Sequence, residues 1–311
     1  MEQKQALHNR IDEKFKAIDQ NPNVHLEGLV WAKPMNYWDY IMPDALLNLQ
    51  VQRTTLPDEM VFILYHQLNE ILFKMILWEI DQVGSYKKIE ADFFIEKLRR
   101  IRRYFDMLST SFDIMGDGMD VKQYNNFRHT LTPASGFQSA QYRLIEFSST
   151  ELINLIDYRF RSSINRNTPY EYAYEHLYWQ AAGKDHATGI KNTMITLFEE
   201  RYKAEFLVKM ERYNTSNLWT KFKQLPEPVK TDAELVRAMR HYDYTVNVSW
   251  VMAHYNAAAK YLGNAEATGG SDWRKYMHPK HQQRIFFPDL WTDEELKNWG
   301  SDEMIKSKLL Y

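Results

Sequence analysis

One long apolar stretch limits the fold more than any other feature of this chain. It begins at Pro57 and reaches Ile80 without an internal proline or glycine. Proline favours the first turn of a helix, and the acids Asp58 and Glu59 that follow it suit the positive end of the helix dipole. Because the stretch is apolar nearly all round, it predicts a long helix at the buried centre of a helical fold.

Two polar residues within this stretch stand out. His66 and Glu70 lie one helical turn apart, and Phe62 lies one turn before the histidine. A buried histidine needs polar partners, so the pair forms either a structural hydrogen bond or part of a ligand site.

The rest of the chain favours helices as well. Runs of alternating β-branched residues are almost absent, and further helices are expected at residues 5–18, 92–108, 192–213 and 232–262. Caps that start helices are expected at Thr168, Thr231 and Thr292. Segment 226–228 is expected to be a turn between helices. The sequence therefore predicts an all-α fold in a single domain, residues 1–311.

Charge and composition argue against several classes of protein. The 39 basic and 41 acidic residues give a net charge of −2, whereas a nucleic-acid-binding protein normally has a basic excess. The basic run 97–103 is expected to lie on the solvated face of a helix rather than to form a phosphate-binding patch. The absence of cysteine excludes disulfides, thiolate metal sites and a cysteine nucleophile.

Neither a membrane span nor an export signal is expected. The N-terminus is polar and lacks the apolar segment of a signal peptide, and no apolar run reaches the ~18 residues of a membrane helix. The sequence therefore predicts a soluble, cytoplasmic protein.

Aromatic residues are plentiful, with 20 Tyr, 16 Phe and 9 Trp. Several lie in the first 50 residues, among them Trp31, Tyr37, Trp38 and Tyr40. Because such side chains are seldom left in water, this N-terminal arm, residues 1–50, is expected to cover either its own core or a neighbouring subunit.

A second stretch, residues 121–131, places an arginine on an aromatic and aliphatic stripe. Tyr124, Arg128 and Leu131 have the i, i+4, i+7 spacing of one helical face. The planar guanidinium fits a carboxylate. Arg128 is therefore either a clamp for a ligand carboxylate or a side chain that reaches into solvent from a packed face.

A third stretch joins a helix to a glycine-rich loop. His254 lies in the middle of an alanine-rich helix, on the same face as Trp250, and the helix leads to the loop from Ala267 to Ser271. Paired glycines permit a tight loop with free backbone N–H groups. The pattern indicates either a ligand site with a lid, or a satisfied histidine followed by an ordinary helix end.

Absent motifs narrow the chemistry. The chain has no H-E-x-x-H for zinc, no glycine-rich nucleotide motif, no G-x-S-x-G nucleophile and no glutamate followed three residues later by histidine. Haem is the cofactor that needs few protein groups: one axial imidazole, an apolar pocket and a few polar side chains.

Three blocks together carry a resemblance to a known family. They are D-E-M-V-F-I-L-Y-H-Q, Y-N-N-F-R-H-T-L-T-P-A-S-G-F-Q-S and H-Y-N-A-A-A-K-Y-L-G-N-A-E-A-T-G-G-S. In order and spacing they resemble the tryptophan 2,3-dioxygenase family over about residues 37–271. The resemblance implies an all-helical subunit of a homotetramer that binds haem b. It also implies that O2 opens the indole ring of L-tryptophan to N-formylkynurenine, the first step of tryptophan catabolism by the kynurenine route.

The resemblance also implies roles for individual residues. His254 would be the proximal haem ligand, and Ser135 would lie at the haem edge. Around the indole ring of the substrate, Phe62 and Leu131 would pack and His66 would contact the N–H. Arg128, with Tyr124, would bind the carboxylate, and Thr268 would contact the amino-acid end. Tyr37 and Tyr40 would come from a neighbouring subunit.

Two departures from the family pattern bear on these roles. Ala267 stands where the family usually has glycine, and this difference affects closure of the loop. Ile71 and Leu72 stand where the family usually has Leu-Trp, and this difference affects packing. The alternatives are a related haem-dependent oxygenase, including a monooxygenase, that acts on another indole or aromatic amino acid; a non-catalytic haem- or indole-binding protein; and a helical interaction protein without haem.

Overall fold

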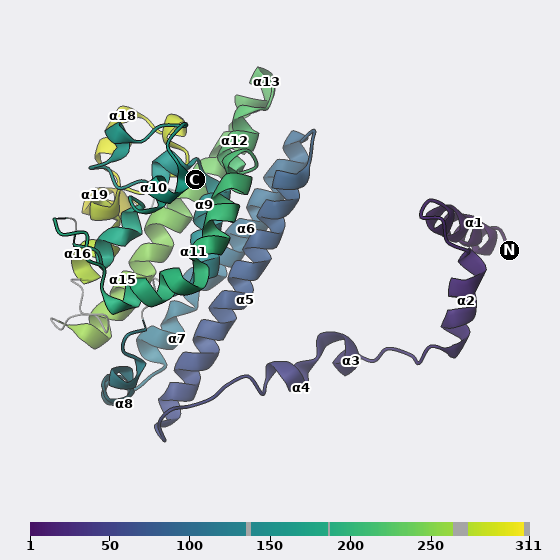
Figure 1. Ribbon diagram of the computed structural model, residues 1–311, viewed down its shortest axis with the longest axis horizontal. Coiled ribbons are helices and arrows are strands. Elements are labelled where there is room, and N and C mark those ends of the chain that lie inside the picture. The colour runs from purple at the N-terminus through teal and green to yellow at the C-terminus, as the bar shows by residue number, and fades with distance from the viewer. Residues whose placement is uncertain (135–137, 186, 264–272, 308–311) are drawn as a thin grey trace. The chain divides into compact units, whose positions relative to one another are not determined.

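The computed structural model describes residues 1–134, 138–185, 187–263 and 273–307 (Figure 1). These residues form helices joined by loops, and the strand-like pairings among them are two isolated bridges, Ile156 with Leu177 and Lys184 with Lys191. The predicted all-α class is confirmed for this part of the chain. The chain divides into two compact units, Met1–Gln50 and Val51–Tyr311.

The first unit contains four helices. The expected N-terminal helix is present, and the second helix, which the sequence analysis did not foresee, begins where the side chain of Asn21 accepts a hydrogen bond from the backbone of Asn23. Tyr37 and Tyr40 are largely exposed within this unit. The helices are α1 (Glu2–Lys16), α2 (Pro22–Trp31), α3 (Tyr37–Ile41) and α4 (Pro43–Leu46).

The second unit holds the remaining elements. Its α-helices are α5 (Pro57–Ser85), α6 (Ala91–Thr110), α7 (Phe112–Asp117), α8 (Val121–Phe127), α9 (Ala140–Ser149), α10 (Tyr170–Tyr174), α11 (Thr193–Asn214), α12 (Leu218–Lys223), α13 (Glu227–Lys230), α14 (Ala233–Tyr244), α15 (Trp250–Leu262), α16 (Trp273–Met277), α17 (Pro279–Gln282), α18 (Asp293–Lys297) and α19 (Asp302–Lys306). Its 3-10 helices are η1 (Arg128–Leu131), η3 (Leu152–Leu155), η4 (Arg161–Ser163), η5 (Tyr178–Ala182) and η7 (Pro288–Leu290), and η6 (Thr245–Ser249) is a π-helix.

The core lies where α5 packs against α6 and α9, with α14 on α6 and α11 on α9 (Figure 1). Ile76 and Ile80 of α5 and Ile101 and Phe105 of α6 are fully buried there. The expectation that α5 is buried all round was wrong, because one side of it is open: Trp78 is 71% exposed.

Two further expectations about charged and apolar helices also need correction. Lys97 does not lie on a solvated face but is buried, and its ammonium lies 2.6 Å from the carboxylate of Glu79. Helix α5 is long and apolar enough to cross a membrane, contrary to the expectation that no segment was. By length and composition alone this is a weak indication, since the core helix of a soluble protein passes the same test.

Of the three expected helix caps, one is present as predicted, one is shifted by one residue and one is absent. Thr292 caps α18 as predicted, and its side chain and that of Glu295 form a capping box. Asp232, rather than Thr231, caps α14, and α10 begins after Pro169 without a side-chain cap from Thr168. Segment 226–228 lies at the start of the short helix α13 instead of forming only a turn.

A π-helical turn interrupts the helix expected at residues 232–262. The segment η6 separates α14 from α15, and four of its five residues are buried. A π turn adds a residue to the helical repeat and rotates the faces on either side of it relative to each other. The side chains of α15 therefore point in directions that the sequence period alone did not give.

Candidate active site

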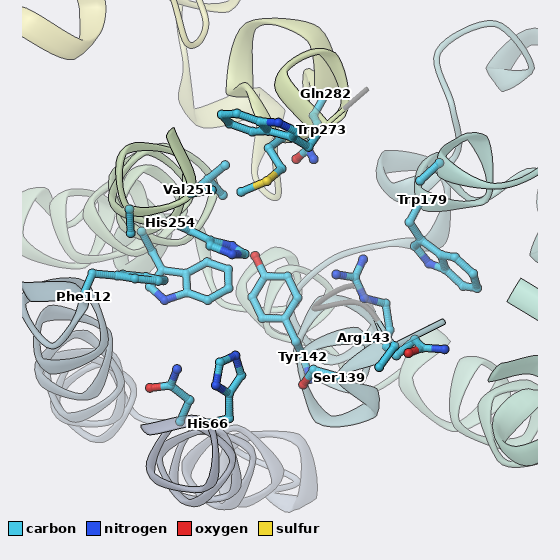
Figure 2. A pocket seen from close by; sticks show the side chains of 18 of the residues that line it. His66, Phe112, Ser139, Tyr142, Arg143, Trp179, Val251, His254, Trp273 and Gln282 are labelled. Atoms are coloured by element: carbon cyan, nitrogen blue, oxygen red, sulfur yellow. The ribbon is translucent and has the colours of Figure 1, made fainter. Parts of the chain in front are cut away.

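A cavity of about 710 Å³ lies within the second unit (Figure 2). Its walls come from α5, α7, α8, α9, α11, α15, α16 and α17 together with η1, η5 and connecting loops. This volume lies within the range of cofactor and small-molecule sites, which are typically apolar with a few placed polar groups. The cavity brings together residues from all three sequence blocks: His66 from the first, Tyr124 and Leu131 from the second and His254 from the third.

His254 lies on α15 between aromatic neighbours. Its imidazole stacks on the ring of Phe112 at a centroid distance of 5.3 Å, and Trp250 lies one turn before it at 6.0 Å. Burial lowers the pKa of His254 to about 4, and the facing His66 adds to this effect. The ring is therefore neutral at pH 7, and a neutral imidazole has the lone pair that binds metals.

His66 lies on α5 and points into the same cavity (Figure 2). Its Nδ1 lies 2.8 Å from the carbonyl oxygen of Phe62. Because a carbonyl oxygen only accepts hydrogen bonds, Nδ1 carries the proton. Burial lowers the pKa of His66, so the ring is held in its neutral form and Nε2 keeps its lone pair.

The carboxylate of Glu70 is hydrogen-bonded to residues other than His66. Its carboxylate accepts hydrogen bonds from Ser139 Oγ at 2.7 Å and from Gln141 Nε2 at 2.9 Å. Its charge acts on His66 only through space and favours the protonated imidazole less than burial disfavours it. Of the two alternatives, the structural hydrogen bond between His66 and Glu70 is not seen among the described residues, and the polar edge of His66 faces the cavity.

Phe62 joins His66 to the aromatic wall formed by α8. Its ring centroid lies 4.1 Å from that of His66 and 6.1 Å from that of Tyr124. Tyr124 in turn lies 4.6 Å from Tyr261 of α15. Burial raises the pKa of the Tyr124 hydroxyl, which stays protonated at neutral pH and can donate a hydrogen bond.

Arg128 is placed differently from its predicted neighbours. Helix α8 ends at Phe127 and the chain continues as the 3-10 helix η1, so Tyr124, Arg128 and Leu131 do not share one face of a single α-helix as predicted. Tyr124 and Leu131 line the cavity, whereas Arg128 is buried beside it and is not among the described lining residues. Its charge acts on the Tyr124 hydroxyl, which places it close to this wall.

Four predicted site residues cannot be placed in the cavity. Ser135 and Thr268 lie outside the described residues, as does Ala267. Tyr37 and Tyr40 belong to the first unit, which is described separately from the second. Among the described residues, no group of three or more His, Cys, Asp or Glu side chains could hold a metal ion, so His254 is a single candidate ligand rather than part of a cluster.

Sequence reasoning missed a buried polar cluster in the cavity wall. Arg143 and Glu146 of α9 are joined there by Arg284, Tyr142 and Tyr178. The i, i+3 spacing of Arg143 and Glu146 in an otherwise apolar helix was a readable signal. Arg284 comes from the loop between α17 and η7, far along the chain, and no local pattern marks it.

Comparison with known proteins gives the same family over most of the chain. A family model described as tryptophan 2,3-dioxygenase matches residues 27–249, more than two thirds of the chain. A protein of Ruegeria pomeroyi named tryptophan 2,3-dioxygenase is 26% identical over 275 residues, which cover 84% of this chain and 92% of that protein. A protein of the same name from Ruegeria sp. strain TM1040 is 25% identical, and the match covers 88% of this chain and 96% of that protein. Another from Bacillus thuringiensis is 26% identical, and the match covers 83% of this chain and 91% of that protein.

Proposed function

Because the chain belongs to the tryptophan 2,3-dioxygenase family, we propose that it is a haem-dependent oxidoreductase that opens the indole ring of L-tryptophan with O2. Both oxygen atoms enter the substrate and the product is N-formylkynurenine. No external electron donor is consumed, in keeping with the lack of a nucleotide-binding motif. The observation that carries the proposal is a neutral His254 that faces His66 across one cavity of about 710 Å³.

The residues present fit a haem group. His254 offers a neutral imidazole to an iron ion, Phe112 and Trp250 supply flat apolar walls beside it, and the cavity has the volume of a cofactor site. His254 would hold the iron through its imidazole, and Ser135 would lie at the edge of the group. When bound in the ferrous state, haem supplies the capacity to bind and activate O2.

The tautomer of His66 suits it to orient the substrate. Its Nδ1 donates to the Phe62 carbonyl, so Nε2 is the acceptor that faces the cavity. An indole N–H donates only, and its hydrogen bond to Nε2 fixes the position of the ring while Phe62 and Leu131 pack around it. The indole N–H is a very weak acid, so His66 orients the substrate and need not remove this proton.

The amino-acid end of the substrate would lie toward α8 and η1. Arg128 would bind the carboxylate through its planar guanidinium, with the Tyr124 hydroxyl beside it and Thr268 at the ammonium group. Tyr37 and Tyr40 would come from the N-terminal arm, residues 1–50, of a neighbouring subunit. The assembly would then be a homotetramer of single-domain subunits in the cytoplasm that exchange these arms and bind neither nucleic acid nor membrane.

One experiment tests the reaction directly. Reduced, haem-loaded protein is given L-tryptophan and isotope-labelled O2, and the product is analysed by mass spectrometry. Two labelled oxygen atoms in a ring-opened product support the proposal. One labelled atom contradicts it in favour of a monooxygenase, and bound haem without any product contradicts the choice of substrate.

A further inference from the structure

The buried cluster in the cavity wall contains more positive than negative charge. Arg143 is 5% exposed, Arg284 is 3% exposed and Glu146 is 1% exposed. Both guanidinium groups use the same carboxylate: Arg143 Nη1 lies 2.9 Å from Glu146 Oε2, and Arg284 Nη1 contacts Glu146 Oε1. Two buried cations therefore share one buried anion.

The tyrosines of the cluster do not supply a second negative charge. Burial raises the pKa of the Tyr142 hydroxyl and that of the Tyr178 hydroxyl, so both remain neutral phenols at physiological pH. Burial disfavours the charge of Arg143, whereas Glu146, Tyr178 and Tyr142 favour it and Arg284 opposes it, and on balance the pKa of Arg143 is raised. A buried charge without a full counter-charge is unfavourable, and an anion from a ligand would offset it.

The other acidic groups of the cavity wall are engaged elsewhere. Asp157 lies 2.6 Å from the guanidinium of Arg159, with which it forms an ion pair. Glu70 lies on α5 and accepts hydrogen bonds from Ser139 and Gln141. Neither is bonded to Arg143 or Arg284. The buried carboxylate of Asp243 reaches Arg284 only through the amide of Asn247, so Glu146 is the one carboxylate paired with Arg143 among the described residues.

The open hydrogen-bonding capacity belongs to Arg143 rather than to Arg284. All three nitrogen atoms of the Arg284 guanidinium have partners, which are Asn247, Glu146, Tyr178 and Tyr142. Arg143 donates from Nη1 to the Tyr178 hydroxyl at 2.8 Å, and its Nε is enclosed by protein without a hydrogen-bond partner among the described residues. Its Nη2 is hydrogen-bonded to no described residue, so this is the nitrogen that a ligand can reach. Figure 2 shows the Arg143 guanidinium turned into the cavity, to one side of the gap between His66 and His254.

We propose that Arg143 binds a carboxylate of the ligand held between His66 and His254, and that this carboxylate is a propionate of the porphyrin. The inference rests on the proposed function. Iron ligation uses the centre of a haem group, whereas its propionates lie at the periphery, and Arg143 lies beside the gap between the two histidines. The carboxylate of the amino-acid substrate has the same chemistry, but Tyr124, Leu131 and the nearby Arg128 lie on a different wall, formed by α8 and η1.

The test uses metal-free protoporphyrin IX, which His254 cannot ligate through iron. The full-length apoprotein is titrated with protoporphyrin IX and with its dimethyl ester, and porphyrin fluorescence gives each dissociation constant. Arg143→Met is expected to bind the free acid roughly 10- to 100-fold more weakly than the wild type, the worth of a hydrogen bond to a charged group. The same variant is expected to bind the ester, which has no carboxylate, as the wild type does.

Two further variants make the result specific. Arg143→Met leaves Arg284 and Glu146 as a one-to-one pair, so the cluster keeps its main ion pair, and thermal unfolding checks that the variant is folded. If it does not fold, Arg143→Gln is used, because its amide can still donate to the Tyr178 hydroxyl. Arg159→Met is the matched control: this arginine lines the same cavity but is paired with Asp157, and its loss is expected to leave porphyrin binding unchanged.

The possible outcomes distinguish a porphyrin carboxylate from a substrate carboxylate, and they distinguish a failure of this inference from a failure of the proposed function. Equal weakening for acid and ester overturns the inference, because the lost contact is then not to a carboxylate. Unchanged porphyrin binding with weakened L-tryptophan binding assigns the carboxylate to the substrate and overturns the propionate assignment. A protein that discriminates acid from ester through Arg143 but makes no product from L-tryptophan and O2 supports this inference and contradicts the proposed function alone.

Discussion

His66 disfavours a positive charge on His254, because the two imidazoles face each other across one cavity from helices α5 and α15. Each ring is also kept neutral by burial. The two rings differ in one respect: the Nδ1 proton of His66 is held by the Phe62 carbonyl, whereas no described residue is hydrogen-bonded to His254. This difference suits His254 to bind a metal and His66 to orient a substrate, and mutation of each residue can test the two roles separately.

Replacement of His254 by alanine is expected to remove the iron ligand. Haem binding to His254→Ala should weaken by about 100-fold or more, since the bond from the imidazole to the metal is lost. The measurement is a haem titration followed by absorbance. His66→Ala is the matched control, because this histidine is placed at the substrate, and it should take up haem as the wild type does. Equal haem affinity in both variants would contradict the assignment of His254 as the residue that binds the iron.

Replacement of His66 by phenylalanine is expected to weaken the orientation of the substrate without ending catalysis. The value of kcat/KM for L-tryptophan should fall roughly 10- to 100-fold, because one hydrogen bond to the substrate is lost. With 1-methyl-L-tryptophan, which has no indole N–H, the wild type and the variant should react at similar rates. A complete loss of activity in His66→Phe toward both substrates would instead indicate that His66 takes part in the chemistry.

Arg128 can be tested with a substrate analogue that lacks the carboxylate. Arg128→Ala should bind haem normally but bind L-tryptophan roughly 100-fold more weakly, because a charge-assisted contact to the carboxylate is lost. Binding of tryptamine, which has no carboxylate, should be the same in both proteins. Arg128 is buried next to the cavity rather than in its lining. If only the melting temperature falls while L-tryptophan binding is unchanged, its role is packing.

The sequence predicted helices more reliably than it predicted the directions of their side chains. The long apolar stretch from Pro57 and the helices at 92–108 and 192–213 are present because their local patterns agree with the fold. The π turn at η6 and the change from α8 to a 3-10 helix at Arg128 have no local signal of this kind, and both alter which residues share a face. They arise from packing in the folded chain.

The same limit applies to buried charges. Lys97 belongs to a run of basic residues that was predicted to be exposed to solvent. It is buried because it forms an ion pair with Glu79 of the neighbouring helix α5. Arg284 likewise enters the cavity wall from a distant loop. Sequence patterns reveal period and local spacing, but partners separated by many residues depend on the complete fold.

Asp243 gives a prediction for the pH dependence of stability. It is fully buried, and it accepts hydrogen bonds from the backbone N–H groups of Phe286 and Phe287 and from the side chains of Trp291 and Asn247. Burial nevertheless raises the pKa of Asp243 to about 6, against an unfolded value near 3.8. The folded state thus binds this proton more tightly than the unfolded state. Its contribution to stability is complete below about pH 4 and is lost as the pH rises through about 6.

The measurement compares wild type with Asp243→Asn by urea unfolding. Between about pH 4 and pH 7 the free energy of unfolding of the wild type, relative to that of the variant, should fall by up to about 3 kcal/mol. The variant should be the less stable protein at both ends, because its amide N–H groups would face donors from the backbone and from Trp291. A constant difference across this range would contradict the raised pKa.

The ion pair between Lys97 and Glu79 gives the last prediction. Lys97→Met should destabilise the protein by roughly 3–5 kcal/mol, because Glu79 would remain buried with only Arg100, 3.5 Å away, as a cationic partner. Combining it with Glu79→Leu should recover most of this loss, since the unpaired buried charge is then removed. Arg99→Met is the control at the exposed pair of Arg99 and Glu234, and it should change stability by less than about 1 kcal/mol. Urea unfolding measures the stability of all of these variants. If the double variant is no more stable than Lys97→Met, the unpaired charge of Glu79 is not the cause of the lost stability.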